Sequence, residues 1–131
     1  NDHAVAEQIR GRLIPGLREE STNLCGDTSL AQAIDLLSCA DAVVSNDSGL
    51  MHVAAALNRP LVAVYGSTSP GFTPPLADQV EMVRLGLDCS PCFDRTCRFG
   101  HYNCLRDLAP AQVDAALDRL VGDLLPDPQD S

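Results

Sequence analysis

The sequence contains no tryptophan, and aromatic residues make up only 4% of it. The core must therefore consist of aliphatic side chains and alanine rather than large rings. Basic residues are also scarce, because 9 Lys and Arg stand against 18 Asp and Glu, for a formal net charge of −9. A nucleic-acid backbone requires a cationic surface, so this balance argues against a nucleic-acid partner. No apolar run is long enough to cross a bilayer, so we expect no transmembrane segment.

The length of 131 residues is enough for one domain with its own core but not for two. The first residue is Asn rather than Met, nothing resembling a signal peptide follows it, and the chain opens on helix-like sequence with no strand before it. These features predict a piece of a longer cytoplasmic protein. We expect residues 1–125 to form the domain and residues 126–131 to form a frayed tail.

The spacing of apolar residues predicts the helices. One helix is expected over residues 4–13 and ends at Pro15 and Gly16. A second begins at Ser29, which stands three positions before Gln32 in a capping-box pattern. Two more helices are expected over residues 49–57 and 110–125.

Short apolar runs predict the strands, which we place at residues 42–45, 60–65 and 80–85. The run at 60–65 is apolar on both faces, as a strand of a parallel sheet must be. Residues 23–25 are a further candidate for a short strand. Helices and short buried strands in alternation predict an α/β fold, with a Rossmann-like parallel sheet flanked by helices.

The stretch SNDSGLMHVAAAL, residues 45–57, lies between a predicted strand and a predicted helix. Ligands of parallel sheets gather at the carboxyl ends of strands, and the free N–H groups of a helix start suit a phosphate. Gly49 leaves the backbone open to a pyrophosphate, and His52, one turn on, can donate a hydrogen bond to it. Asp47 either caps the helix or accepts hydrogen bonds from a sugar. The same residues also fit ordinary helix capping with no ligand.

Residues 45–75, SNDSGLMHVAAALNRPLVAVYGSTSPGFTPP, resemble the donor-binding half of the bacterial heptosyltransferases. The resemblance covers nearly the whole chain and is weakest in the cysteine-containing segment and the tail. It implies a GT-B glycosyltransferase with two Rossmann-like halves, of which this chain is the C-terminal one. It also implies transfer of heptose from ADP-heptose to the lipopolysaccharide inner core, with inversion and without a metal. The expected location is the cytoplasmic face of the inner membrane of a Gram-negative bacterium, with peripheral association.

The resemblance also assigns residues. Those that match the family's motif for the diphosphate and sugar are Asp47, Ser48, Gly49 and His52. His52 would stabilise the leaving group. Contacts to adenosine correspond to Thr28 and Ser29, and a loop facing the substrate cleft corresponds to Gly66, Ser67 and Thr68. The family's general base and a phosphate-binding Lys lie upstream of this chain, so the chain alone is expected to be inactive.

Residues 86–105 form a cysteine-rich loop with Cys89, Cys92, Cys97 and Cys104. The C-x₂-C spacing of the first pair is typical of a zinc knuckle, whereas six residues separate the second pair. Three interpretations stay open: reduced thiols in a loop, a structural zinc or iron–sulfur site, and disulfides, which a cytoplasmic protein disfavours. Arg95 and Arg98 either face an anionic substrate or are solvated.

The sequence therefore leaves two classes of function open. The first is the donor-binding domain of an inverting heptosyltransferase, whose catalysis needs no cofactor, or of a GT-B relative using another nucleotide-sugar. The second is a non-catalytic nucleotide- or zinc-binding α/β module.

Overall fold

The computed structural model describes residues 2–71 and 74–122. The chain divides into two compact units, residues 1–36 and 37–131. The predicted tail at 126–131, and the last three residues of the predicted helix at 110–125, lie outside the described residues. Among the described residues, none of the helices is both long and apolar enough to cross a membrane.

The N-terminal unit contains α1 (Asp2–Gly11), α2 (Pro15–Glu20) and most of α3 (Leu30–Ser38). The sequence correctly ends the first helix before Pro15 but misses α2, which begins at that same proline. Proline is well tolerated in the first turn because the missing N–H would have no partner there. Arg18 braces the junction of the two helices by donating from Nη2 to the carbonyl of Gly11 at 2.8 Å.

The candidate strand at residues 23–25 is wrong. The Asn23 side chain donates to the carbonyl of His3 at 3.1 Å and to Glu7 Oε1 at 3.0 Å, and it accepts from the amide of Cys25 at 3.1 Å. These bonds hold Cys25 in a turn instead of a strand. The hydrogen bond from Asn23 lowers the pKa of the Glu7 carboxylate, and the charge of Arg10 lowers it further.

The start of α3 agrees with the sequence. Ser29 Oγ accepts from the amide of Gln32 at 3.2 Å, and Gln32 Oε1 accepts from the amide of Ser29 at 2.9 Å. The predicted capping box is confirmed.

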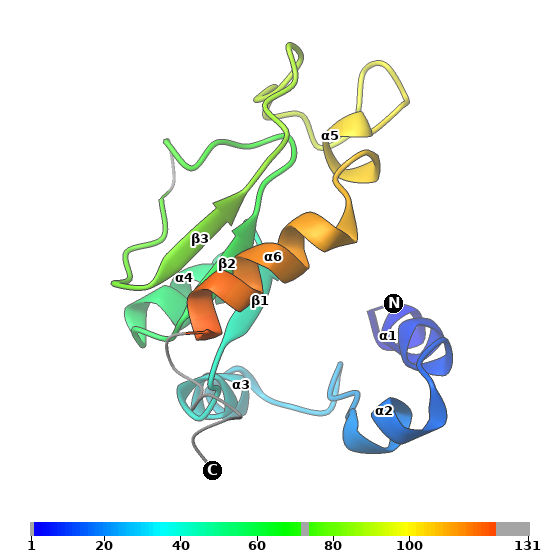
Figure 1. Cartoon of the computed structure of the whole chain (residues 1–131), viewed down its shortest axis with the longest axis vertical. Helices are drawn as coiled ribbons and strands as arrows, with labels where there is room; N and C mark the ends of the chain where they lie inside the picture. The colour runs from blue at the N-terminus through cyan, green and yellow to red at the C-terminus, as the bar shows by residue number, and fades with distance from the viewer. Residues whose placement is uncertain (1, 72–73, 123–131) are drawn as a thin grey trace. The chain divides into compact units, whose positions relative to one another are not determined.

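The second unit contains a three-stranded parallel sheet with β2 (Leu61–Val64) between β1 (Val43–Asn46) and β3 (Val80–Val83), visible in Figure 1. The three predicted strands are confirmed: β1 lies one residue later than the predicted 42–45, and β2 and β3 are shorter than the predicted 60–65 and 80–85. The register pairs Asn46 with Val64 and Val64 with Val83, so all three strands end at one edge of the sheet.

Two helices cover opposite faces of this sheet. Leu61 and Ala63 of β2 pack with α4 (Gly49–Ala56), through its buried residues Met51, Ala54 and Ala55. Val62 and Val64 point to the other face and pack with α6 (Pro110–Val121), through Ala116 and Leu120. The alternation along β2 explains why the strand is apolar throughout. The α/β fold predicted from the sequence is confirmed.

Between β3 and α6 the chain forms the cysteine-rich loop and a one-turn helix, α5 (Asn103–Arg106), which the sequence does not predict. Four residues are too few for apolar periodicity to reveal a helix. Leu108, just after α5, is buried with Val62 and Val83 and anchors the end of this connection in the core.

Candidate functional site

The candidate site lies where β1 and β2 end. Asp47 follows β1, and its amide continues the ladder by donating to the carbonyl of Val64 at 3.2 Å. The loop that follows β2 carries Gly66, Ser67 and Thr68. Because β1 and β2 are neighbours in the sheet, it brings the Asp47–Gly49 turn and the 66–68 loop together.

The first turn of α4 is capped by Ser48. This residue has an extended backbone with φ −152° and ψ 171°, and its Oγ accepts from the amide of Met51 at 3.4 Å. The structure thus gives the cap position to Ser48, so Asp47 is not the cap. The amides of Gly49 and Leu50 have no intrahelical acceptor, and no hydrogen bond to another described residue satisfies them. This pair of donors is available to an anion.

Gly49 stands at an open position. Apart from its chain neighbours and the backbone of its own helix, no atom of the described residues lies within 4 Å of a Cβ built there. No side chain from elsewhere in the described structure therefore covers this position. A phosphate can approach the backbone there without displacing a neighbour.

The Asp47 carboxylate is held at the rim of this turn. Thr68 Oγ1 donates to Asp47 Oδ2 at 2.6 Å, and His52 Nε2 lies 3.9 Å from Asp47 Oδ1. The Asp47 side chain is only 17% exposed, whereas His52 is exposed on the outer face of α4. Three of the residues predicted from the sequence therefore form one cluster around the helix start.

Tyr65 lies beneath this cluster and is missed by the sequence analysis. It is fully buried, and its hydroxyl donates to Met51 Sδ at 3.7 Å. Burial raises the pKa of the Tyr65 phenol, and the nearby Asp47 carboxylate raises it further. The signal for it in the sequence is weak, because a tyrosine that ends an apolar strand looks like any other core residue.

Gly66 and Ser67 are held from the cysteine-rich loop. Ser90 Oγ donates to the carbonyl of Gly66 at 2.6 Å, and the amide of Phe93 donates to the carbonyl of Ser67 at 2.8 Å. Leu105 covers Gly66 so closely that a Cβ there would lie 2.8 Å from Leu105 Cγ. These contacts position the loop after β2, and nothing in the sequence pattern pairs these residues.

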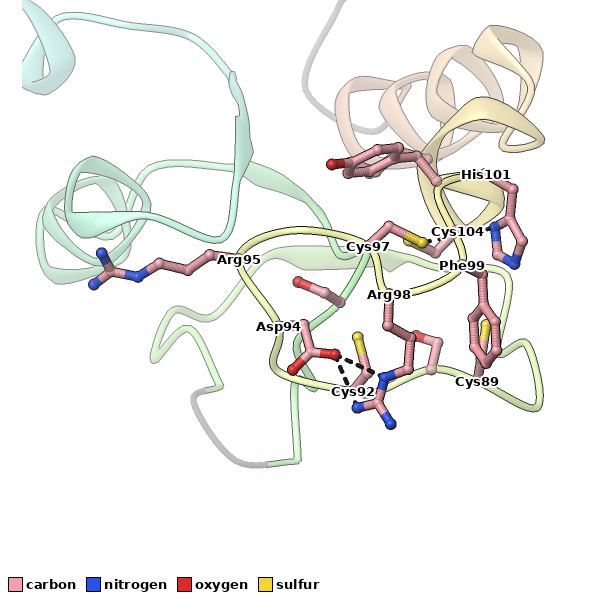
Figure 2. Close-up of a pocket in the computed structure, with 13 residues that line it drawn as sticks. Cys89, Cys92, Asp94, Arg95, Cys97, Arg98, Phe99, His101 and Cys104 are labelled. Carbon is pink, nitrogen blue, oxygen red and sulfur yellow. Dashed lines mark hydrogen bonds and ion pairs between the residues drawn. The ribbon is translucent and has the colours of Figure 1, made fainter.

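The same loop borders a cavity of about 120 Å³ in the cysteine-rich segment (Figure 2). Its wall includes Ser67 on one side, and among its other lining residues are Cys89, Cys92, Cys97, His101 and Cys104. All six cysteines of the chain are free thiols. Among the residues that the structure describes, no three His, Cys, Asp or Glu side chains are grouped so that they could hold a metal.

The two arginines of the segment behave differently. Arg98 forms an ion pair with Asp94, with Nη2 at 2.8 Å and Nε at 2.9 Å from Oδ2. This carboxylate raises the pKa of Arg98. Arg95 extends away from the labelled cysteines, as Figure 2 shows. A contact of either arginine with an anionic substrate stays a prediction.

Cys97 has the most distinctive thiol environment. The backbone amides of Tyr102, Phe99, His101 and Gly100 lower its pKa, the first of them most strongly, by stabilising the thiolate. His101 Nδ1 lies 3.9 Å from the Cys97 sulfur and accepts from the amide of Asn103 at 3.0 Å.

Thr28 and Ser29 belong to the N-terminal unit, where Ser29 caps α3. Their predicted contact with adenosine stays a prediction.

The family model for glycosyltransferase family 9 (heptosyltransferase) matches residues 1–103 of the chain. The chain belongs to this family. The match includes both loops of the candidate site and most of the cysteine-rich loop, so the heptosyltransferase resemblance noted from the sequence is confirmed at the level of the family.

Individual relatives agree with this family assignment. The chain is 56% identical over 84 residues to lipooligosaccharide heptosyltransferase 2 of Haemophilus influenzae, covering 64% of this chain and 24% of that protein. It is 42% identical over 120 residues to lipopolysaccharide heptosyltransferase 2 of Escherichia coli K12, covering 92% and 34% respectively. The solved structure of E. coli ADP-heptose LPS heptosyltransferase II matches with a TM-score of 0.79 and 41% identity, covering 94% of this chain and 34% of that one.

This family 9 chain therefore spans about a quarter to a third of the length of these relatives. Its fold corresponds to one part of a heptosyltransferase.

Proposed function

We propose that this chain is the donor-binding part of a heptosyltransferase that transfers heptose from ADP-heptose to the lipopolysaccharide inner core. The observation that carries the proposal is the open helix start in a member of family 9. The amides of Gly49 and Leu50 have no acceptor among the described residues, a side chain at Gly49 would meet no atom beyond its chain neighbours and helix backbone, and Asp47 and His52 lie at the rim. This arrangement suits a sugar diphosphate: amides for the phosphates and a carboxylate for hydroxyl groups.

The chemistry that the geometry supports is stabilisation of a leaving group. Negative charge develops on the diphosphate as the bond to the sugar breaks, and donors that are already in place lower the energy of that state. The first-turn amides are fixed by α4, and His52 is one turn away on the same helix. We propose that these donors stabilise the diphosphate without a metal ion.

Asp47 has a separate role in this proposal. A carboxylate repels a diphosphate, so it must be turned toward another partner. Thr68 holds one oxygen at 2.6 Å, which fixes the orientation of the group. The carboxylate then accepts hydrogen bonds from hydroxyl groups of the sugar, which distinguishes the donor from ADP alone.

Inverting transfer also needs a base that removes the proton of the acceptor hydroxyl. We propose that this base and the acceptor site belong to the part of the protein outside this chain. The chain then binds ADP weakly and transfers no heptose by itself. Measurable transfer by this chain alone would contradict that division of roles. We further propose that the whole protein acts at the cytoplasmic face of the inner membrane.

Nucleotide titration tests the donor site. Calorimetry with ADP, UDP and GDP is expected to show binding of ADP alone. Gly49→Ala places a methyl group in the open space without a clash and should weaken ADP binding about tenfold, the equivalent of losing ~1.4 kcal/mol. Gly11→Ala is a matched control, because a Cβ there also meets no atom within 4 Å.

Two further variants separate the roles. His52→Ala should weaken binding of both ADP and ADP-heptose, whereas Asp47→Ala should weaken binding of the sugar nucleotide more than that of ADP. Equal affinity for all three nucleotides, unchanged by Gly49→Ala, would contradict the proposal and favour a non-catalytic module.

A further inference from the structure

The cysteine-rich loop is not held by a hydrophobic core. No helix or strand forms between Val83 and Asn103, a stretch that the structure describes throughout. None of the hydrophobic side chains in residues 84–107 is buried, and Phe93, Phe99 and Leu105 are all more than half exposed. Irregular stretches of this length are uncommon in compact domains unless they have a function or another source of order.

Hydrogen bonds to the rest of the domain hold only the first part of the loop among the described residues. Ser90 and Phe93 tie its first part to Gly66 and Ser67. Beyond Phe93 the hydrogen bonds between described residues of the loop are local, for example the ion pair of Arg98 with Asp94 and the bond from the Gly100 amide to the Cys97 carbonyl at 3.0 Å. The middle of the loop can therefore shift without breaking contacts to the sheet.

Four thiols gather around this weakly held segment. Cys89, Cys92, Cys97 and Cys104 all line the one cavity beside Ser67 (Figure 2), although their sequence positions lie on both sides of the irregular middle. They are free thiols and none is deeply buried.

We propose that Cys89, Cys92, Cys97 and Cys104 bind one zinc ion in a tetrahedral site that orders the cysteine-rich loop. Four thiolates are the donor set of structural zinc sites, and Cys89 and Cys92 have the spacing of a zinc knuckle. As they stand, the thiols are not grouped closely enough to hold a metal within the described residues. Zinc binding must therefore draw the middle of the loop inward, with loss of the thiol protons.

His101 is a neighbour of this site and not one of its ligands. Its Nδ1 accepts from the amide of Asn103 at 3.0 Å, and its ring stacks on Phe99 with the ring centroids 5.5 Å apart. The site is structural: with four protein ligands it leaves no open position for a substrate.

Metal analysis of the full chain, purified with a reductant and without a chelator, tests the proposal. We expect one zinc per chain. After exchange with cobalt, the absorption bands of tetrahedral cobalt bound to thiolates should appear. Cys89→Ser, Cys92→Ser, Cys97→Ser and Cys104→Ser should each lower zinc content and weaken those bands. The double variant Cys25→Ser, Cys39→Ser is the matched control and should retain the full zinc content, as should His101→Ala.

The cobalt spectrum is recorded on the unsubstituted chain. A variant that fails to fold therefore cannot be mistaken for the absence of a metal site. A folded, reduced chain that binds neither zinc nor cobalt would overturn the proposal, as would iron with acid-labile sulfide in place of zinc. Loss of metal in the Cys25, Cys39 variant alone would also overturn it. Nucleotide titration of the same samples is independent, so failure of the zinc site and failure of the donor site are distinguishable.

Discussion

The bond between Thr68 and Asp47 joins the two loops of the candidate site, and Thr68→Val tests it. Valine has nearly the shape of threonine but lacks the hydroxyl that donates to Asp47 Oδ2 at 2.6 Å. Hydrogen bonds to charged groups contribute about 1.5–3 kcal/mol to stability. Asp47 is 17% exposed, so water can replace part of the lost bond. We therefore expect a loss of about 1–2 kcal/mol.

Urea unfolding followed by circular dichroism measures this loss directly. For a unit of this size it corresponds to a fall in Tm on the order of 5–10 °C. Ser69→Ala is the control, because the Ser69 hydroxyl lies on the same loop and accepts a local hydrogen bond, from the amide of Gly71 at 3.1 Å. That variant should change stability by less than about 0.5 kcal/mol.

A double-mutant cycle with Asp47→Asn isolates the pair. The coupling between Thr68 and Asp47 should account for most of the loss in Thr68→Val. If Thr68→Val matches the wild type within about 0.5 kcal/mol, or the coupling is absent, then the two loops are not joined as the structure has them. The proposed orientation of the carboxylate would then lose its support.

Two other predictions concern residues around the same loops. Gly66→Ala places a Cβ 2.8 Å from Leu105 Cγ, so the Leu105 side chain must move. Because Leu105 is 52% exposed, we expect a loss of about 1 kcal/mol or less in urea unfolding, which Leu105→Ala should relieve; a loss that Leu105→Ala leaves unchanged would show that Leu105 does not cover Gly66. The pKa of Tyr65 is raised above its ordinary value of 10.0. The neutral phenol therefore stabilises the fold below pH 10, and this contribution is lost as the pH rises through the pKa of the folded state. Tyr65→Phe should remove that part of the alkaline decline in stability, and identical alkaline profiles would contradict the buried phenol.

The sequence predicts the sheet and its helices well because their apolar patterns are complete within short windows. The alternation of Leu61, Val62 and Ala63 is sufficient to identify a strand that is buried on both faces. The capping box at Ser29 is equally local. By contrast, α2 is missed because the sequence pattern indicates Pro15 only as the end of one helix, although it begins another. No strand forms at residues 23–25, because the Asn23 side chain supplies hydrogen bonds that hold Cys25 in a turn.

In the candidate site, too, local features could be predicted from the sequence and long-range contacts could not. The order of strand, turn and helix is enough to place Asp47, Ser48, Gly49 and His52, because a strand end and a helix start are local features. Which partner Asp47 takes depends on a residue twenty-one positions away, and no periodicity encodes that distance. The contacts of Ser90 and Phe93 with the loop after β2 are also long-range, and they come from a segment without regular structure.

These long-range contacts form one continuous connection from the cysteine-rich loop to the helix start. Ser90 and Phe93 hold Gly66 and Ser67, and the next residue, Thr68, holds Asp47. A shift of the cysteine-rich loop therefore acts on the loop after β2 first, and on the carboxylate only through it. Since the amides of Gly49 and Leu50 belong to α4, which packs on β1 and β2, they do not depend on this connection. Disorder in the cysteine-rich loop should accordingly impair the contacts made by Asp47 while leaving the phosphate-binding amides in place.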